Sequence, residues 1–154
     1  FENSGIEVRA TSLELGSAAT VADAIKALLA QVSDDDGYLS VQAYLDRTSV
    51  PEAAELRDLF AKATRRPVTF GWAPRFLHST GQYHKGGPRQ GVYLQIVATA
   101  KQDIAVPGRD FTFGELIASQ AAGDAKVLGA LGRPVLTLTL TEVKAGLAAI
   151  KNAI

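Results

Sequence analysis

The sequence predicts an α/β fold, a three-layer sandwich with a mainly parallel sheet, in a single domain over residues 1–154. Two observations support this prediction. Apolar runs of strand length alternate with segments whose apolar residues recur at helical spacing, which is typical of parallel sheets covered by helices. Two of the runs, residues 38–45 and 91–99, are apolar almost throughout. Such runs are typical of strands that are buried on both faces.

The first segment of the chain predicts a short strand followed by a helix. Apolar residues alternate loosely over residues 6–15, as expected of a strand. Thr20 and Asp23 then have the spacing of a capping box, and apolar residues at helical spacing follow them. The three aspartates at 34–36 end this helix in a solvated turn rather than forming a metal site.

A second helix is expected after the buried strand 38–45. Ser49 and Glu52 again have capping-box spacing, with a proline in the first turn, and Pro67 stops the helix. Residues 67–72 return as a strand.

The last third of the chain predicts one more long helix, a strand and a final helix. Thr112 and Glu115 open the long helix as a capping box, residues 135–140 alternate as a strand, and residues 141–154 form the last helix. The apolar stripe expected to face inward from the long helix consists of Leu116, Ile117, Ala121, Val127, Leu128 and Leu131.

Residues 72–91 carry an unusual concentration of special residues and are predicted to form a long loop. Both histidines of the chain, His78 and His84, lie in this segment. Its prolines and glycines come at short intervals and argue against a helix: Pro74, Gly81, Gly86, Gly87 and Pro88. Long loops in compact domains are usually functional, and this one leaves a strand at the carboxyl edge of the predicted sheet, where ligands of parallel sheets bind.

The charge of the whole chain cancels, but its distribution is uneven. Sixteen basic and sixteen acidic side chains give no net field, so no nucleic-acid or membrane partner is expected. Between Leu59 and Gln102 there is no Asp or Glu, which predicts a site for an anionic ligand. Part of the positive charge has a second interpretation, because basic residues at a helix C-terminus complement its dipole. The seven basic residues of this window are Lys62, Arg65, Arg66, Arg75, Lys85, Arg89 and Lys101.

Several classes of protein are excluded by what the sequence lacks. There is no cysteine for a disulfide or thiolate site, and no apolar run approaches the roughly 20 residues of a membrane span. His78 and His84 have no third ligand nearby, so neither a metal nor a cofactor is expected. The start of the chain has no signal-peptide pattern, which predicts a cytoplasmic location. The chain also has no methionine, so we expect it to be processed or part of a longer polypeptide.

The motifs of residues 72–91 resemble those of a known enzyme family. Phe76–Tyr83, Lys85–Pro88 and Val92–Ile96 are similar to the C-terminal region of bacterial glucose-6-phosphate isomerases, of the type found alone or fused behind transaldolase. Phe111–Leu116 is similar to the Tyr-Thr-Phe-Gly helix start of this family. The resemblance covers roughly residues 38–140.

The resemblance implies a sugar isomerase (SIS) domain and an aldose–ketose isomerisation. The family interconverts glucose 6-phosphate and fructose 6-phosphate through ring opening and an enediol. His78 matches the histidine that assists ring opening, although an imidazole that only bonds loop carbonyls is the alternative. Ser79, Gln82 and Lys85 are candidates for contacting substrate or bracing the loop. The remaining two candidates, Arg75 and Arg89, are expected to hold the anionic group or to face solvent.

The chain departs from the family pattern at two places, where the family has its glutamate base and its C-terminal lysine. No carboxylate precedes His78 where the family's glutamate base is expected, and Gly132–Val135 replaces the segment that carries a C-terminal lysine in many members. The resemblance therefore implies a C-terminal part that is inactive alone. Its expected partners are the sugar phosphate substrate, the N-terminal part of the same enzyme and a second copy in a homodimer.

Two other functions are kept as alternatives. A non-catalytic SIS module would use the same segment only to bind a phosphosugar. A single-stranded nucleic-acid module would use Trp72, Phe76 and Tyr83 as stacking groups, and the zero net charge argues against it.

Overall fold

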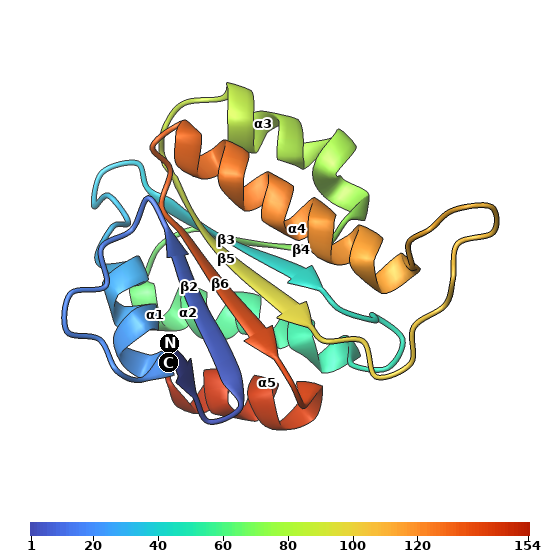
Figure 1. Cartoon of the computed structure of the whole chain (residues 1–154). Helices are drawn as coiled ribbons and strands as arrows, with labels where there is room; N and C mark the ends of the chain where they lie inside the picture. The colour runs from blue at the N-terminus through green and yellow to red at the C-terminus, as the bar shows by residue number, and fades with distance from the viewer.

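The computed structural model describes residues 1–154 as one six-stranded sheet with helices on both faces (Figure 1). The strand order is β1-β2-β6-β5-β3-β4. The last four strands of this order run parallel, while β1 and β2 form an antiparallel edge. The predicted three-layer α/β sandwich with a mainly parallel sheet is confirmed. The strands are β1 (Glu2–Asn3), β2 (Ile6–Thr11), β3 (Tyr38–Tyr44), β4 (Val68–Trp72), β5 (Gly91–Ala98) and β6 (Val135–Leu140).

The helices divide into two layers around this sheet (Figure 1). Three of them, α1, α2 and α5, cover one face, and α3 and α4 lie over the other. No helix of the chain combines the length and the apolar character needed to cross a bilayer. The helices are α1 (Val21–Leu29), η1 (Pro51–Glu55), α2 (Leu56–Thr64), η2 (Arg75–His78), α3 (Thr80–Gly86), α4 (Phe113–Ala130) and α5 (Val143–Asn152).

The main hydrophobic core lies on the side of α1, α2 and α5, which we call the apolar face of the sheet. Alternate residues of each strand point to this side, such as Leu39, Val41 and Leu138. They belong to a cluster of 20 buried apolar residues that also includes one stripe of each covering helix. Burial of this apolar surface is the main driving force for folding of the chain.

Two of the three predicted capping boxes are present. Thr20 Oγ1 accepts a hydrogen bond from the backbone N–H of Asp23, and the Asp23 carboxylate accepts one from the N–H of Thr20. Thr112 and Glu115 form the same reciprocal pair at the start of α4. The prediction for Ser49 is wrong. Its hydroxyl donates to the Asp46 carboxylate at 2.5 Å, and a 3₁₀ turn begins behind it without a side-chain cap.

The prediction of a loop over residues 72–91 is also wrong, because two short helices, η2 and α3, form there. Pro74 and Pro88 lie outside these helices and bound them instead of interrupting them. Gly81 is inside α3, where a Cβ atom would lie 3.1 Å from the backbone oxygen of Phe76. This glycine therefore permits close packing of α3 on η2, which outweighs its low helix propensity.

The inward stripe predicted for α4 is only partly correct. Ala121 and Leu128 are buried, but Leu116, Val127 and Leu131 are 37%, 44% and 45% exposed. The buried positions of α4 instead include a charged residue, Asp124, which sequence periodicity does not single out.

Candidate functional site

The sheet side under α3 and α4, which we call the polar face, differs in chemistry from the apolar face. The strand register places Gly71, Gln42, Gln95, Thr137 and Arg9 in one row across five strands. Gln42 and Gln95 are both fully buried. Burying an amide side chain costs free energy unless it is hydrogen-bonded. Both glutamines are therefore expected to have hydrogen-bond partners on this face.

Each of the two glutamines is held in a chain of hydrogen bonds. Thr137 Oγ1 donates to Gln95 Oε1 at 3.0 Å, and Gln95 Nε2 donates to Gln42 Oε1 at 3.1 Å. The Gln42 amide nitrogen then lies 3.4 Å from His84 Nδ1. The network thus runs across three parallel strands and ends at an imidazole on α3.

A buried ion pair lies against this network. Lys85 Nζ on α3 is 2.5 Å from Asp124 Oδ1 on α4, and the Asp124 side chain is only 3% exposed. Asp124 Oδ2 lies 3.5 Å from Gln95 Nε2, so the pair and the glutamine network are in contact. The ion pair joins the two helices that cover the polar face, and it engages one of the basic residues of the acid-free window.

Arg133 holds the C-terminal end of α3 in place through hydrogen bonds to backbone oxygens. Its side chain, with the residue 4% exposed, donates hydrogen bonds to the backbone oxygens of Pro88, Lys85 and Gly87 at 2.9, 3.2 and 2.7 Å. These carbonyls are at and just beyond the helix C-terminus, where backbone oxygens have no helical partner. Arg133 has no carboxylate partner, so it leaves a positive charge close to the polar network.

The environment of His84 sets its protonation state. Burial lowers the pKa of His84 below its usual value, opposed by Asp124 and reinforced by Lys85 and Arg133. The ring is therefore neutral at pH 7. Because Gln42 Oε1 already accepts from Gln95, the amide nitrogen of Gln42 faces His84 Nδ1. Nδ1 acts as an acceptor in this arrangement, and the ring proton resides on Nε2.

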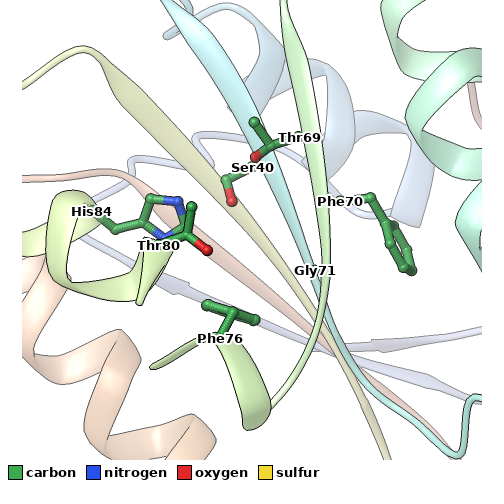
Figure 2. Close-up of a pocket in the computed structure, with 7 residues that line it drawn as sticks. All are labelled: Ser40, Thr69, Phe70, Gly71, Phe76, Thr80 and His84. Carbon is green, nitrogen blue, oxygen red and sulfur yellow. The ribbon is translucent and has the colours of Figure 1, made fainter. Parts of the chain in front are cut away.

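A small crevice opens between α3 and the edge strand β4 (Figure 2). Its volume is about 40 Å³. Figure 2 shows the hydroxyl groups of Ser40, Thr69 and Thr80 and the ring of His84 around the same space, with Phe76 as one wall. Gly71 allows the Phe76 ring to pack directly against β4, because a Cβ atom at position 71 would lie 2.8 Å from that ring.

A larger groove of about 750 Å³ lies on the same side of the sheet, between α4 and strands β2 and β6. Glu7, Arg9 and Thr11 of β2 line one side, and small residues of α4 such as Ala118 and Ala122 line the other. Near Thr11, α4 approaches β2 so closely that a Cβ atom at Gly129 would overlap the Thr11 side chain. The groove contains both Gln95 and Thr137 and so reaches the polar network.

The structure places four of the six predicted site residues on one exposed segment beyond the carboxyl end of β4. His78 ends η2, and its exposed side chain makes no hydrogen bond or ion pair within the chain. Arg75, Ser79 and Gln82 are on the same two short helices, and all three are exposed. Ser79 Oγ donates to the backbone oxygen of Phe76 at 3.2 Å, and Gln82 Nε2 donates to that of Leu77 at 3.0 Å, so both also brace the turn that carries His78.

The other two predicted residues lie apart from His78 or are already engaged. Lys85 is one turn further along α3 and is paired with Asp124. Arg89 follows α3 and lies against Gly132, where a Cβ atom would be 2.8 Å from its guanidinium. No group of three or more His, Cys, Asp or Glu side chains that could hold a metal ion is present.

Sequence reasoning missed most of the buried polar network. Gln42 and Gln95 carried a usable signal, because each is a lone amide in a run predicted to be a strand buried on both faces. Asp124 and Arg133 gave no such signal, since a charged residue in a helix or turn usually faces solvent.

Comparison with known proteins adds information on the fold alone. No family model matches the chain, and no curated protein matches it. Among solved structures, the chain is similar to a hypothetical protein from Thermus thermophilus, with a TM-score of 0.68 and 17% sequence identity. The match covers 87% of this chain and 39% of that protein, so the chain spans well under half the length of this structural neighbour.

Proposed function

We propose that the chain is the C-terminal part of a glucose-6-phosphate isomerase and contributes His78 to its active site. The observation that carries this proposal is the placement of His78. An imidazole that is free of intramolecular partners is presented at the carboxyl end of a parallel strand, on a turn braced by Ser79 and Gln82. Ligands of parallel α/β sheets bind at this edge.

The chemistry assigned to His78 is proton transfer during ring opening. An imidazole can give a proton to the ring oxygen of a sugar and take one from its anomeric hydroxyl. Arg75 is on the same 3₁₀ turn and supplies positive charge for the anionic substrate. Lys85 has a structural role in this proposal, because its ammonium group neutralises Asp124.

The proton transfer between C1 and C2 needs a carboxylate base that this chain does not place beside His78. In our proposal this base comes from the N-terminal part of the same enzyme or from a second copy of the chain. The isolated chain is accordingly expected to be inactive.

The lack of a carboxylate partner for His78 also favours a second candidate, a non-catalytic module that binds phosphosugars. The two candidates differ in what His78 does. In the isomerase, loss of the imidazole removes turnover and leaves affinity largely intact. In the binding module it weakens binding, and there is no turnover to lose.

We further propose that the chain forms a homodimer through the outer face of α4. Four exposed apolar residues follow one stripe of this helix: Phe113, Leu116, Val127 and Leu131. Their spacing is nearly symmetric about the middle of the helix. An antiparallel α4–α4 contact would therefore place Phe113 against Leu131 and Leu116 against Val127 of a second copy. Such self-complementarity is what a two-fold interface requires.

This dimer is tested by measuring mass in solution with light scattering after size-exclusion chromatography. Val127→Asp is expected to convert a dimer into a monomer, because it introduces a charge within the apolar contact. Ala122→Asp on the groove side of the same helix is the matched control and should leave the dimer intact. A monomeric wild-type protein at micromolar concentration would refute the interface.

The catalytic proposal is tested by assaying interconversion of glucose 6-phosphate and fructose 6-phosphate by the longest native polypeptide that contains this sequence. His78→Ala should lower kcat by about 10²–10⁴, the usual contribution of a general acid–base group. Gln31→Ala, at an exposed position just after α1, is the control and should retain full activity. A wild-type polypeptide that binds glucose 6-phosphate without turnover would transfer the assignment to the binding module.

A further inference from the structure

The crevice between α3 and β4 is lined by polar atoms of two buried residues that have no hydrogen-bond partner within the chain. Ser40 is 2% exposed and His84 is 5% exposed, yet the Ser40 hydroxyl and His84 Nε2 form no hydrogen bond within the chain. Both lie at the inner end of the crevice, while Thr69 and Thr80 are exposed at its rim (Figure 2). Because these atoms face the crevice, their hydrogen-bond partners come from solution.

The crevice presents donors rather than acceptors for a ligand. The neutral imidazole is held as the Nε2–H tautomer by Gln42, so it can only donate a hydrogen bond into the crevice. Ser40, Thr69 and Thr80 add three hydroxyl groups that are free to donate. No carboxylate, lysine or arginine side chain lines the crevice, so a ligand there is held by hydrogen bonds and not by a charged side chain.

The electrostatic surroundings favour an anion. Three charged groups act on His84: Asp124 carries a negative charge, and Lys85 and Arg133 carry positive charges. Lys85 and Asp124 neutralise each other as an ion pair. The charge of Arg133 stays unbalanced because its hydrogen-bond partners are backbone oxygens.

The size of the crevice limits what part of a ligand can enter. One water needs roughly 10–15 Å³ of such space, so the volume of about 40 Å³ corresponds to about three waters. Three waters occupy about the space of the three terminal oxygens of a phosphoryl group. We propose that the crevice formed by Ser40, Thr69, Thr80 and His84 is a binding site for a tetrahedral oxyanion, namely a phosphoryl group.

This site is separate from the role assigned to His78. Thr80 and His84 lie on α3, whereas His78 precedes that helix and is exposed. The inference stands on the crevice alone and does not depend on the isomerase proposal.

The experiment uses the two histidines as separate reporters in the ¹⁵N-labelled 154-residue chain. Inorganic phosphate is titrated at about pH 7.5 while potassium chloride keeps the ionic strength constant, and both imidazoles are followed by long-range ¹H–¹⁵N spectra. We expect a saturable shift of the His84 signals, with a dissociation constant on the order of 1 mM for so small a ligand. The His84 signals of the free protein should be those of the neutral Nε2–H tautomer.

Three variants define the site. Ser40→Ala and, at the exposed rim, Thr80→Val should each weaken phosphate binding at least about five-fold, which is roughly the loss of one hydrogen bond. Thr80→Val keeps the size of the side chain, so it tests the hydroxyl even if Ser40→Ala unfolds the protein. Ser119→Ala on the exposed part of α4 is the control and should bind phosphate like the wild type.

Comparison of ligands distinguishes a phosphoryl site from a sugar site. Glucose 6-phosphate should shift His84 as inorganic phosphate does, and glucose should not. The proposal is overturned if phosphate shifts only His78, if neither histidine responds, if Thr80→Val binds as tightly as the wild type, or if glucose alone produces the shift. None of these readouts involves turnover, so failure of the isomerase proposal and failure of this one are distinguishable.

Discussion

The two faces of the sheet are built from the same strands but have opposite chemistry. On the apolar face, 20 buried apolar residues pack against α1, α2 and α5. On the polar face, the buried positions of the central strands include Ser40, Gln42 and Gln95, covered by α3 and α4. An ion pair and a histidine are buried there as well.

The two faces therefore differ in role: one provides most of the stability, and the other carries the polar groups and cavities. Apolar burial contributes stability at every position, whereas a buried polar network contributes little net stability and becomes unfavourable when one member loses its partner. The crevice and the larger groove also lie on the polar face, which is beside the segment with His78. We therefore assign stability chiefly to the apolar face and propose that ligand recognition belongs to the polar face.

The largest effect is expected from a truncation on the apolar face. Leu138 is fully buried, and Leu138→Ala should lower the free energy of unfolding by about 2–5 kcal/mol, because it leaves a cavity in the main core. Thr139→Ala, on the next residue of the same strand and the opposite face, should change it by about 0.5 kcal/mol or less. Urea denaturation of both variants measures the difference. Equal losses of unfolding free energy in the two variants would contradict the assignment of stability chiefly to the apolar face.

The next largest effect is expected from breaking the buried ion pair. Lys85→Met leaves the Asp124 carboxylate, 3% exposed, without its counter-charge and should cost about 3 kcal/mol. Lys151→Met removes a partner from the Lys151–Glu55 pair, whose carboxylate is 65% exposed, and should cost less than about 1 kcal/mol. The double variant Lys85→Met/Asp124→Leu should recover most of the loss. No recovery in the double variant would argue against an isolated ion-pair effect.

A pH-dependent effect is expected from His84. Burial lowers the pKa of His84 in the folded chain below about 6.5, the ordinary value that applies to the unfolded chain. The unfolded chain therefore binds the proton first as the pH falls. The contribution of His84 is fully present above about pH 6.5 and decreases below it, by at most about 1.4 kcal/mol per pH unit.

Comparing wild type with His84→Asn isolates this contribution, since other titrating groups are common to both proteins. The free energy of unfolding is measured by urea denaturation between about pH 7.5 and about pH 5, which brackets the ordinary histidine pKa. The wild type should lose more stability than the variant over this range. Parallel curves would show that the imidazole is not buried in the neutral form.

The smallest effect is expected from Tyr44, whose buried hydroxyl has no hydrogen-bond partner. Tyr44→Phe removes this unsatisfied group without changing the shape of the ring, so stability should stay the same or rise by up to about 1 kcal/mol. Thermal denaturation detects such a change. A loss of more than about 1 kcal/mol would show that the hydroxyl makes a hydrogen bond that is essential to the polar face.

The fold was predictable from sequence because the spacing of apolar residues along a strand or helix indicates which of its sides is buried. The strands on the apolar face consist of branched apolar residues, and the capping boxes at Thr20 and Thr112 are local signals within four residues. The short helix α3 was missed because glycines are read as helix breakers. Gly81 is instead required by its contact with Phe76, which only tertiary structure reveals.

The polar network was largely beyond prediction because its members are far apart in the chain. Gln42, His84 and Asp124 come from three segments that meet only when α3 and α4 settle on the sheet. The acid-free window around the histidines suggested uncompensated positive charge, yet Asp124 from outside it neutralises Lys85. The exposed position of His78, in contrast, agrees with its proposed role at the surface of a site.

The central claim, that His78 acts in chemistry and not in folding, is tested most directly by measuring kcat and the free energy of unfolding on the same pair of proteins. The pair consists of the longest native polypeptide containing this sequence and its His78→Ala variant, with glucose 6-phosphate as substrate. We predict a kcat lower by about 100-fold or more with a change in unfolding free energy within about 0.5 kcal/mol, as expected for an exposed general acid–base group. Undiminished turnover in the variant, or no turnover in the wild type, would contradict the claim.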